Sequence, residues 1–183
     1  GVVAGVINTL AGGGSLITLP VLIFLGLPAT VANGTNRLAI TVQSVLAVAG
    51  FKRKGVSDFK SSLLMSLPAL IGAIIGAQLA VDVSDILFKR ILAVVMILVL
   101  GLILWNPIRM RQGTVQYDGG MTCLSRRRRI ASMLIFFFIG IYGGFIQAGI
   151  GFLIIAVLTT ISGLNLVETN SHKVFIVGIN AFF

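Results

Sequence analysis

Acidic residues are scarce in this chain, because only 5 of its 183 residues are Asp or Glu, against 14 Lys and Arg. Charged residues of both signs make up 10% of the sequence, whereas soluble domains carry about 25%. Hydrophobic residues account for 57%, and the mean hydropathy is +1.07. So little charge cannot cover a soluble surface, and the composition therefore predicts an all-α, polytopic membrane protein.

Cysteine and histidine are almost absent as well. Cys123 is the only cysteine and His172 the only histidine. A single cysteine excludes an intrachain disulfide and a cysteine-based metal cluster. The sequence also lacks paired carboxylates and a Ser/His/Asp set. It therefore predicts a protein that is not an enzyme and needs no metal and no cofactor.

Apolar runs of about 20 residues, the length that crosses the hydrocarbon core of a bilayer, divide the chain. We expect spans over Gly1–Leu25, Ala32–Phe51, Ser61–Val81, Leu87–Trp105 and Ile130–Ser162, and the start of another near Ser171. The grouping predicts a first membrane repeat over residues 1–105, a basic linker over 106–129 and the start of a second repeat over 130–183.

The basic residues predict the orientation. Ten of the fourteen lie in two stretches between apolar runs, Lys52–Lys60 and Arg109–Arg129. Loops rich in Lys and Arg face the cytoplasm. The connections near Gly26 and Asp82 then face outward. The arginine run Arg126–Arg129 is expected to bind anionic lipid, and no nucleic-acid partner is expected.

Glycine interrupts two of the expected spans. Ala11-Gly12-Gly13-Gly14-Ser15 lies in the first, and Ala148-Gly149-Ile150-Gly151 in the fifth. Irregular backbone at membrane depth is tolerated only where it is buried in protein or lines a polar cavity. Each break precedes a short loop, small polar residues and one basic residue. Paired interrupted segments in two halves of a chain indicate a transporter binding site.

The two copies correspond along their length. Gly1-x-x-Ala4-Gly5 matches Gly140-x-x-Gly143-Gly144, and Gly34-Thr35-Asn36-Arg37 lies opposite Asn170-Ser171-His172-Lys173. An even number of spans between the copies implies parallel repeats unless one segment is re-entrant. The sequence leaves parallel and inverted repeats open.

The order G-x-x-A-G, A-G-G-G, Pro20, G-L-P and A-N-G-T-N, followed by the second glycine-rich copy, resembles the TauE/SafE sulfite exporter family. The resemblance covers nearly the whole chain. It implies a transporter with two repeats of about four helices, here with the second repeat incomplete. It also implies a bacterial inner membrane location, and sulfite, sulfoacetate or related organosulfur anions as substrates.

We expect the substrate near the two breaks. The first copy offers Gly12, Gly13, Gly14, Ser15, Asn33, Thr35, Asn36 and Arg37, and the second offers Gly149, Gly151, Asn170, Ser171 and Lys173. Exposed amides at a helix break attract anions, and a planar guanidinium suits an oxyanion. The alternatives are close helix packing by the glycines, helix capping by the polar residues, and an arginine that snorkels to the interface. A phosphate loop is not expected, because its lysine is missing.

Four further interpretations stay open. Glu168 and His172 could bind a coupling proton or face water. Small residues from Ala69 to Ala80 recur at three- and four-residue spacing, which predicts close packing within one chain or a homo-oligomer face. Gln43 and Gln147 are expected to bond across helices. A non-transporting membrane scaffold, or a transporter of another small solute, is the alternative to an anion exporter.

Overall fold

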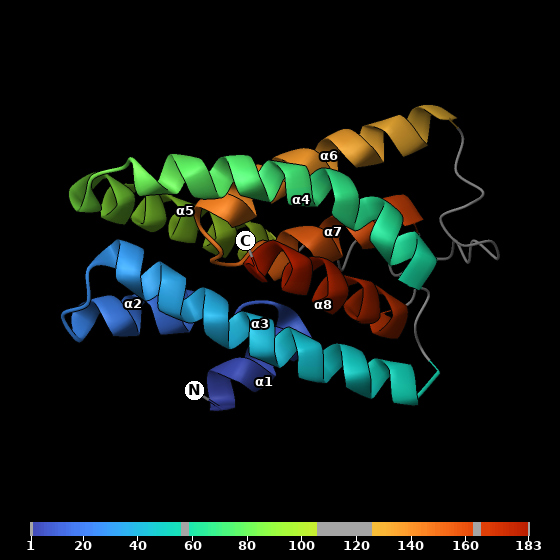
Figure 1. Ribbon diagram of the computed structural model, residues 1–183, viewed down its shortest axis with the longest axis horizontal. Coiled ribbons are helices and arrows are strands. Elements are labelled where there is room, and N and C mark those ends of the chain that lie inside the picture. Colours follow the sequence, from blue (N-terminus) through green and yellow to red (C-terminus); the bar gives the residue numbers. More distant parts are fainter. Residues whose placement is uncertain (1, 56–58, 106–125, 163–165, 183) are drawn as a thin grey trace.

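The computed structural model describes residues 2–55, 59–105, 126–162 and 166–182, which form helices and, within those ranges, no strand. The helices are α1 (Val2–Ala11), α2 (Ser15–Phe24), α3 (Ala29–Arg53), α4 (Phe59–Val81), α5 (Asp85–Trp105), α6 (Arg126–Phe145), α7 (Ile150–Ser162) and α8 (Leu166–Phe182) (Figure 1). The all-α prediction is confirmed.

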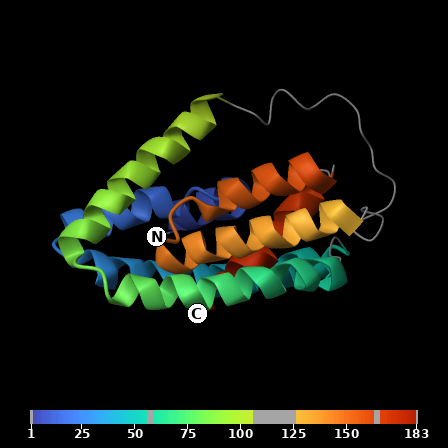
Figure 2. The same cartoon turned by 90° about the horizontal axis from the view of Figure 1, so that it is seen from above.

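Both glycine-rich breaks reverse the direction of the chain. α2 folds back beside α1, which brings Gly14 against Ala4 and Asn8. α7 returns alongside α6 in the same way (Figures 1 and 2). The reversals use a left-handed backbone at Gly12 (φ 80°) and Gly149 (φ 70°), a conformation that glycine adopts without steric cost. The two expected spans are therefore helical hairpins.

The hairpins contain short apolar helices. α1 and α2 have ten residues each, or about 15 Å, which is half of a bilayer's hydrocarbon thickness. Among the described residues, one segment, Ser62–Val81 of α4, is long and apolar enough to cross a membrane by itself. Shorter apolar segments occupy Val2–Ala11, Ser15–Phe24, Ile130–Phe145 and Ile150–Thr159.

The two repeats are inverted. α2 leaves its break toward the left end of the molecule in Figure 1, whereas α7 leaves toward the right end. α3 and α8, which follow the hairpins, also run in opposite directions and pack against each other. The parity argument for parallel repeats fails because both interrupted segments are re-entrant, which removes one crossing from each.

α4 and α6 make the most extensive helix pair, and they touch backbone to backbone. A Cβ atom added at Gly76 would meet the carbonyl of Ile141, and one added at Gly144 would meet that of Ala73. Such approach is possible only between small residues. The stripe that follows Ala69 therefore packs within the chain, which is the first of the two interpretations given above.

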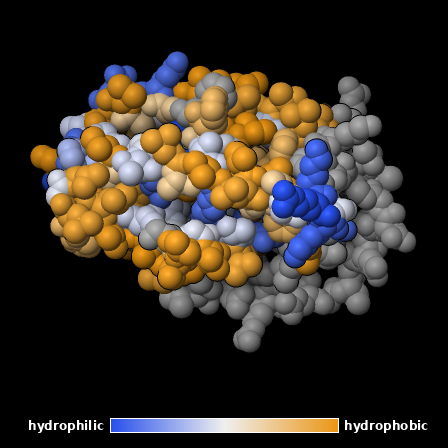
Figure 3. All heavy atoms as spheres, turned by 60° about the horizontal axis from the view of Figure 1, so that its bottom comes forward, coloured by the Kyte–Doolittle hydropathy of each residue, from blue (hydrophilic) through white to orange (hydrophobic). Residues whose placement is uncertain are grey.

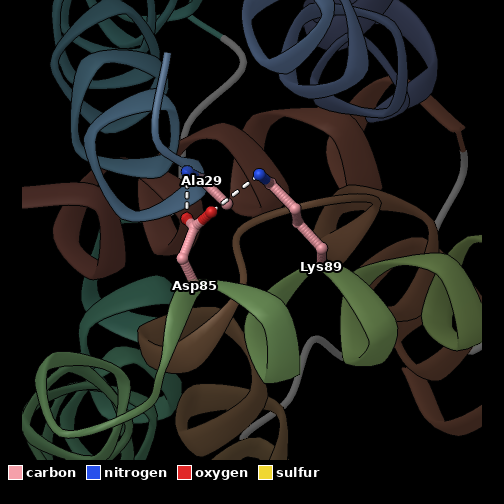
Figure 4. A network of polar contacts seen from close by, with 3 residues as sticks. All are labelled: Ala29, Asp85 and Lys89. Atoms are coloured by element: carbon pink, nitrogen blue, oxygen red, sulfur yellow. Dashed lines mark hydrogen bonds and ion pairs between the residues drawn. The ribbon is translucent and has the colours of Figure 1, made fainter. Parts of the chain in front are cut away.

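A carboxylate fixes the start of α3. Pro28 precedes this helix and has no capping side chain, but Asp85 Oδ1 at the start of α5 accepts the N–H of Ala29 at 2.6 Å. Asp85 Oδ2 also pairs with Lys89 Nζ at 2.7 Å, one turn along α5 (Figure 4). A negative charge at a helix N-terminus is favourable. Asp85 thereby ties α5 to the connection between α2 and α3.

Two buried clusters hold the hairpins against the long helices. Ile40, Phe136, Ile154, Leu158 and Ile176 belong to one cluster, which joins both repeats. The other cluster is Leu19, Ala29, Ala32, Phe88, Leu92, Ile146 and Ala148. Residues from both repeats contribute to each cluster, so the clusters pack the two repeats together.

Candidate functional site

The two glycine-rich breaks lie against each other in the folded molecule. A Cβ atom added at Gly12 would stand 2.5 Å from the Cα of Gly151, and one added at Gly13 would stand 2.5 Å from the ring of Phe152. Glycine is therefore required at position 12, where the clash is with backbone, whereas a side chain at position 13 would displace the Phe152 ring. A cavity of about 10 Å³ beside Gly12, Gly151 and Lys173 has room for about one water molecule.

Ser15 links the breaks by hydrogen bonds. Its hydroxyl donates to the carbonyl of Gln147 at 3.0 Å and accepts the N–H of Gly149 at 3.4 Å. Ser15 begins α2, and Gly149 precedes α7. The N-terminal ends of α2 and α7 thus meet at one point. The first-turn N–H groups of Leu16 and Ile17 bond to the carbonyls of Gly13 and Gly14, and that of Phe152 bonds to the carbonyl of Gly149.

Lys173 of α8 reaches across to the first repeat. Its ammonium donates to the carbonyls of Thr9 at 2.6 Å and Asn8 at 3.2 Å, and its side chain is almost completely buried. These carbonyls end α1, where the helix dipole is negative. Lys173 thus binds the C-terminal end of α1.

Arg37 of α3 makes the reciprocal contact. Its Nη2 donates to the carbonyl of Gly143 at 3.1 Å and to that of Gly144, near the C-terminal end of α6. Each repeat therefore supplies a basic side chain to the broken hairpin of the other. The snorkelling alternative for Arg37 is wrong, because its guanidinium is directed into the protein.

The polar residues before Arg37 divide between two faces of α3. Asn33 and Asn36 are buried, and Asn33 Nδ2 donates to the carbonyl of Phe145 at 3.1 Å. Asn36 Oδ1 accepts the hydroxyl of Thr18 at 2.6 Å. Thr35 is exposed and bonds to Val31 of its own helix. None of the three caps α3, which begins at Ala29, so the capping alternative is wrong.

The corresponding residues of α8 also divide. Ser171 and His172 are buried, Asn170 is half-buried, and Glu168 is exposed. The ring Nδ1 of His172 lies 2.6 Å from the hydroxyl of Ser62 on α4. The two candidates for a coupling proton therefore differ in exposure, although they are one turn apart on the same helix.

Sequence reasoning missed Asn180 and Asn8, and the expectation that the Gln147 side chain bonds across helices is wrong. Gln147 and Asn180 are fully buried, and both amide atoms of each lack a hydrogen-bond partner. Asn8 and Gln43 bond to each other at 3.3 Å across α1 and α3, as expected for Gln43. The signal available in the sequence was an amide shortly before a glycine break, as for Asn8 and Gln147, or about two helix turns after the basic residue of α8, as for Asn180.

An open groove of about 790 Å³ runs beside the first break. Its floor contains Asn8, Thr9, Ser15, Thr18, Asn36 and Gln43, and its walls are apolar residues of α1 and α3. Figure 3 faces this side of the molecule and shows a pale and blue strip between two orange ridges.

These features define the class: an all-α membrane protein built from two inverted repeats, each with a glycine-broken helical hairpin. The chain belongs to the sulfite exporter TauE/SafE family, whose model matches residues 1–183.

Named relatives agree with this assignment. "Probable membrane transporter protein ORF9" of a Sinorhizobium species is 28% identical over 95% of this chain and 64% of the relative. A "Probable membrane transporter protein" of Haemophilus influenzae is 30% identical over 94% and 64%. "Probable membrane transporter protein YfcA" of Escherichia coli K12 is 27% identical over 92% and 60%. The chain thus spans less than two thirds of these relatives, and no solved structure gives a significant match.

Proposed function

We propose that the full-length protein transports a small oxyanion across a bacterial inner membrane, with the substrate held between the two glycine breaks. The observation that carries this proposal is the positive charge there, on the buried Lys173 and the half-buried Arg37. Arg37 and Lys173 bind backbone carbonyls, and no carboxylate among the described residues pairs with either. The Asp85–Lys89 ion pair lies in the first turn of α5 and is partly exposed.

The helix dipoles reinforce this charge. The carbonyl ends of α1 and α6, which are negative, are already bound by Lys173 and Arg37. The amide ends of α2 and α7, which are positive, converge at Ser15 and Gly149. Two cations and two helix N-termini together favour an anion. Isolated charges in a membrane cost several kcal/mol, so their retention supports a function.

The transport step requires movement of the hairpins. The cavity beside Gly12 and Gly151 is about 10 Å³, which is too small for an oxyanion with four or more heavy atoms. Separation of the two breaks would open a site lined by Gly12, Gly13, Gly14, Ser15, Asn33, Asn36, Gly149 and Gly151. Inverted repeats support such alternating access, because one repeat rocks against the other around a site at mid-membrane.

The substrate we propose is sulfite or a small organosulfonate such as sulfoacetate. This choice rests on the family's description as sulfite exporters. The charge at the breaks favours any small oxyanion and does not by itself select sulfur. Thr35 is excluded from the proposed site, because it is exposed and bonds to its own helix.

The decisive experiment measures initial flux in vesicles that contain the full-length protein, with radiolabelled sulfite, sulfoacetate and thiosulfate, and with sodium as the solute for the alternative class. Flux of one or more sulfur anions that saturates and is lost in Lys173→Gln supports the proposal. Flux of sodium alone would favour a transporter of another solute. Absence of flux for every solute, in a correctly inserted protein, would favour a scaffold.

A further inference from the structure

The inverted repeats make each half of the chain a template for the other. α4, a helix of the first repeat, covers the face that α6 and α8 of the second repeat form. Its backbone rests on two glycines of α6, because a Cβ atom at Gly140 would meet Ala69 and one at Gly144 would meet Ala73. This contact is made by a helix of the first repeat on a hairpin of the second.

The equivalent face of the first repeat is open among the described residues. Gly140 and Gly144 correspond to Gly1 and Gly5 in the repeat alignment. A Cβ atom at Gly5 would meet a single atom within 4 Å, Gln43 Oε1 at 3.9 Å. The groove of about 790 Å³ lies on this face (Figure 3), and its walls include the exposed residues Val2, Val6, Val42 and Leu46.

The side-chain amide of Asn36, which lines the groove, also lacks a hydrogen-bond partner, whereas the corresponding residue of the second repeat has one. Asn36 corresponds to His172, whose ring bonds to the hydroxyl of Ser62 on α4 at 2.6 Å. Asn36 lines the groove and is 4% exposed, yet its Nδ2 has no hydrogen-bond partner. Lipid tails offer no acceptor to such a group, and an unsatisfied amide in hydrocarbon is costly.

We propose that this α1–α3 groove is the seat of one further transmembrane helix of the full-length protein, the second-repeat counterpart of α4. Its chemistry follows from α4: glycine or alanine at three- and four-residue spacing rests on Gly5, the counterpart of Gly144, and a hydroxyl about two turns earlier accepts from Asn36 Nδ2. The greater length of the relatives is consistent with such a helix, because the match covers 64% of the first two.

The consequence concerns the site. A helix seated in the groove would enclose its polar floor, which includes Asn8, Gln43 and Thr18. The first break would then be buried on all sides, as the second already is. The proposal concerns the architecture around the site and does not depend on which solute is transported.

Three leucine substitutions in the full-length protein test the seat through thermal stability in detergent. Gly144→Leu is the positive control, because its Cβ meets the carbonyl of Ala73. Gly101→Leu on α5 is the negative control, because a Cβ there has no atom within 4 Å. We expect Gly5→Leu to lower the melting temperature by about 5 °C or more, as Gly144→Leu does. A melting temperature equal to that of Gly101→Leu would overturn the proposal.

A photo-crosslinking residue at Leu46 identifies the occupant independently of stability. Leu46 lines the groove and is exposed. We expect mass spectrometry to find an adduct within the same polypeptide, on a segment with the glycine and alanine spacing described above. Adducts with lipid alone, or with a second copy of the protein, would overturn the proposal even if Gly5→Leu proved destabilising.

Discussion

At the scale of single residues, two basic side chains, the buried Lys173 and the half-buried Arg37, act across the repeat boundary. Arg37 and Lys173 were recognisable in the sequence as charges at the heads of apolar runs, but their partners are backbone carbonyls of the opposite hairpin. Carbonyls accept hydrogen bonds without cancelling the charge. Both side chains can therefore hold the hairpins in place and still attract an anion.

Substitution of Arg37 separates its charge from its donors. Arg37→Lys keeps the charge but loses the planar guanidinium, so weak anion flux should remain. Arg37→Gln keeps donors but loses the charge, and flux should fall about tenfold or more, because hydrogen bonds of charged groups contribute about 1.5–3 kcal/mol. Lys89→Gln, which removes an exposed lysine of the Asp85 ion pair, should leave flux unchanged. The measurement is initial flux at equal protein level, and parental flux in Arg37→Gln would contradict the role of charge.

Gly12 is the glycine at which close approach matters most. Gly12→Ala should abolish flux, because the new Cβ would stand 2.5 Å from the backbone of Gly151, which cannot move aside alone. Gly26→Ala is the matched control: Gly26 also has positive φ (94°), but a Cβ there meets nothing within 4 Å. Both variants carry the strain of a left-handed alanine. Equal flux in the two variants would show that contact between the breaks is unimportant.

At the scale of elements, the helices and their breaks could be predicted, but the hairpins could not. Apolar length and glycine position located α3, α4, α5 and the two interruptions. A glycine break shows that a helix stops and does not give the angle at which the chain continues. The reversal depends on contacts between residues far apart in sequence, such as Ser15 with Gln147. The stripe of small residues on α4 was also predicted from the sequence. Its packing partner, α6, could not be predicted, because it depends on how the second hairpin folds.

Asp85 shows how one side chain can join two elements. Asp85→Ala should lower the melting temperature more than Lys89→Gln, because the first removes the acceptor of the Ala29 N–H and the ion pair together, whereas the second removes only the ion pair. Exposed ion pairs contribute little to stability, and helix caps contribute more. Thermal melts in detergent measure both effects. A larger loss in Lys89→Gln would mean that the cap does not stabilise α3.

At the scale of the whole molecule, charge and shape agree. The end of α3 and the starts of α4 and α6 lie at the right end of Figure 1. Lys52, Arg53 and Lys54 are exposed at this end. The run Arg126–Arg129 begins α6 there, although its side chains lie outside the described residues. The predicted linker, which contains Cys123, also lies outside the described residues. Because exposed basic residues gather at this end of the molecule, we propose that it is cytoplasmic.

The inverted architecture gives a sharp test of this orientation. If Ile130–Ser162 crossed the membrane once, Ser162 would lie on the side opposite Gly55. In the hairpin, α7 returns to the end at which α6 begins, so both residues should be cytoplasmic (Figures 1 and 2). Single cysteines at Gly55, Ser84 and Ser162, with Cys123 replaced by serine, can be labelled in vesicles of known orientation with a maleimide that does not cross the membrane.

We expect Gly55→Cys and Ser162→Cys to react from the cytoplasmic face and Ser84→Cys, in the connection between α4 and α5, to react from the outer face. The reason is geometric: three helices, α3 to α5, separate the two hairpins, so the hairpins must enter from opposite faces. Labelling of Ser162→Cys from the outer face would show that Ile130–Ser162 crosses the membrane once and would contradict the second hairpin. Labelling of Gly55→Cys and Ser84→Cys from the same face would contradict α4 as a membrane span.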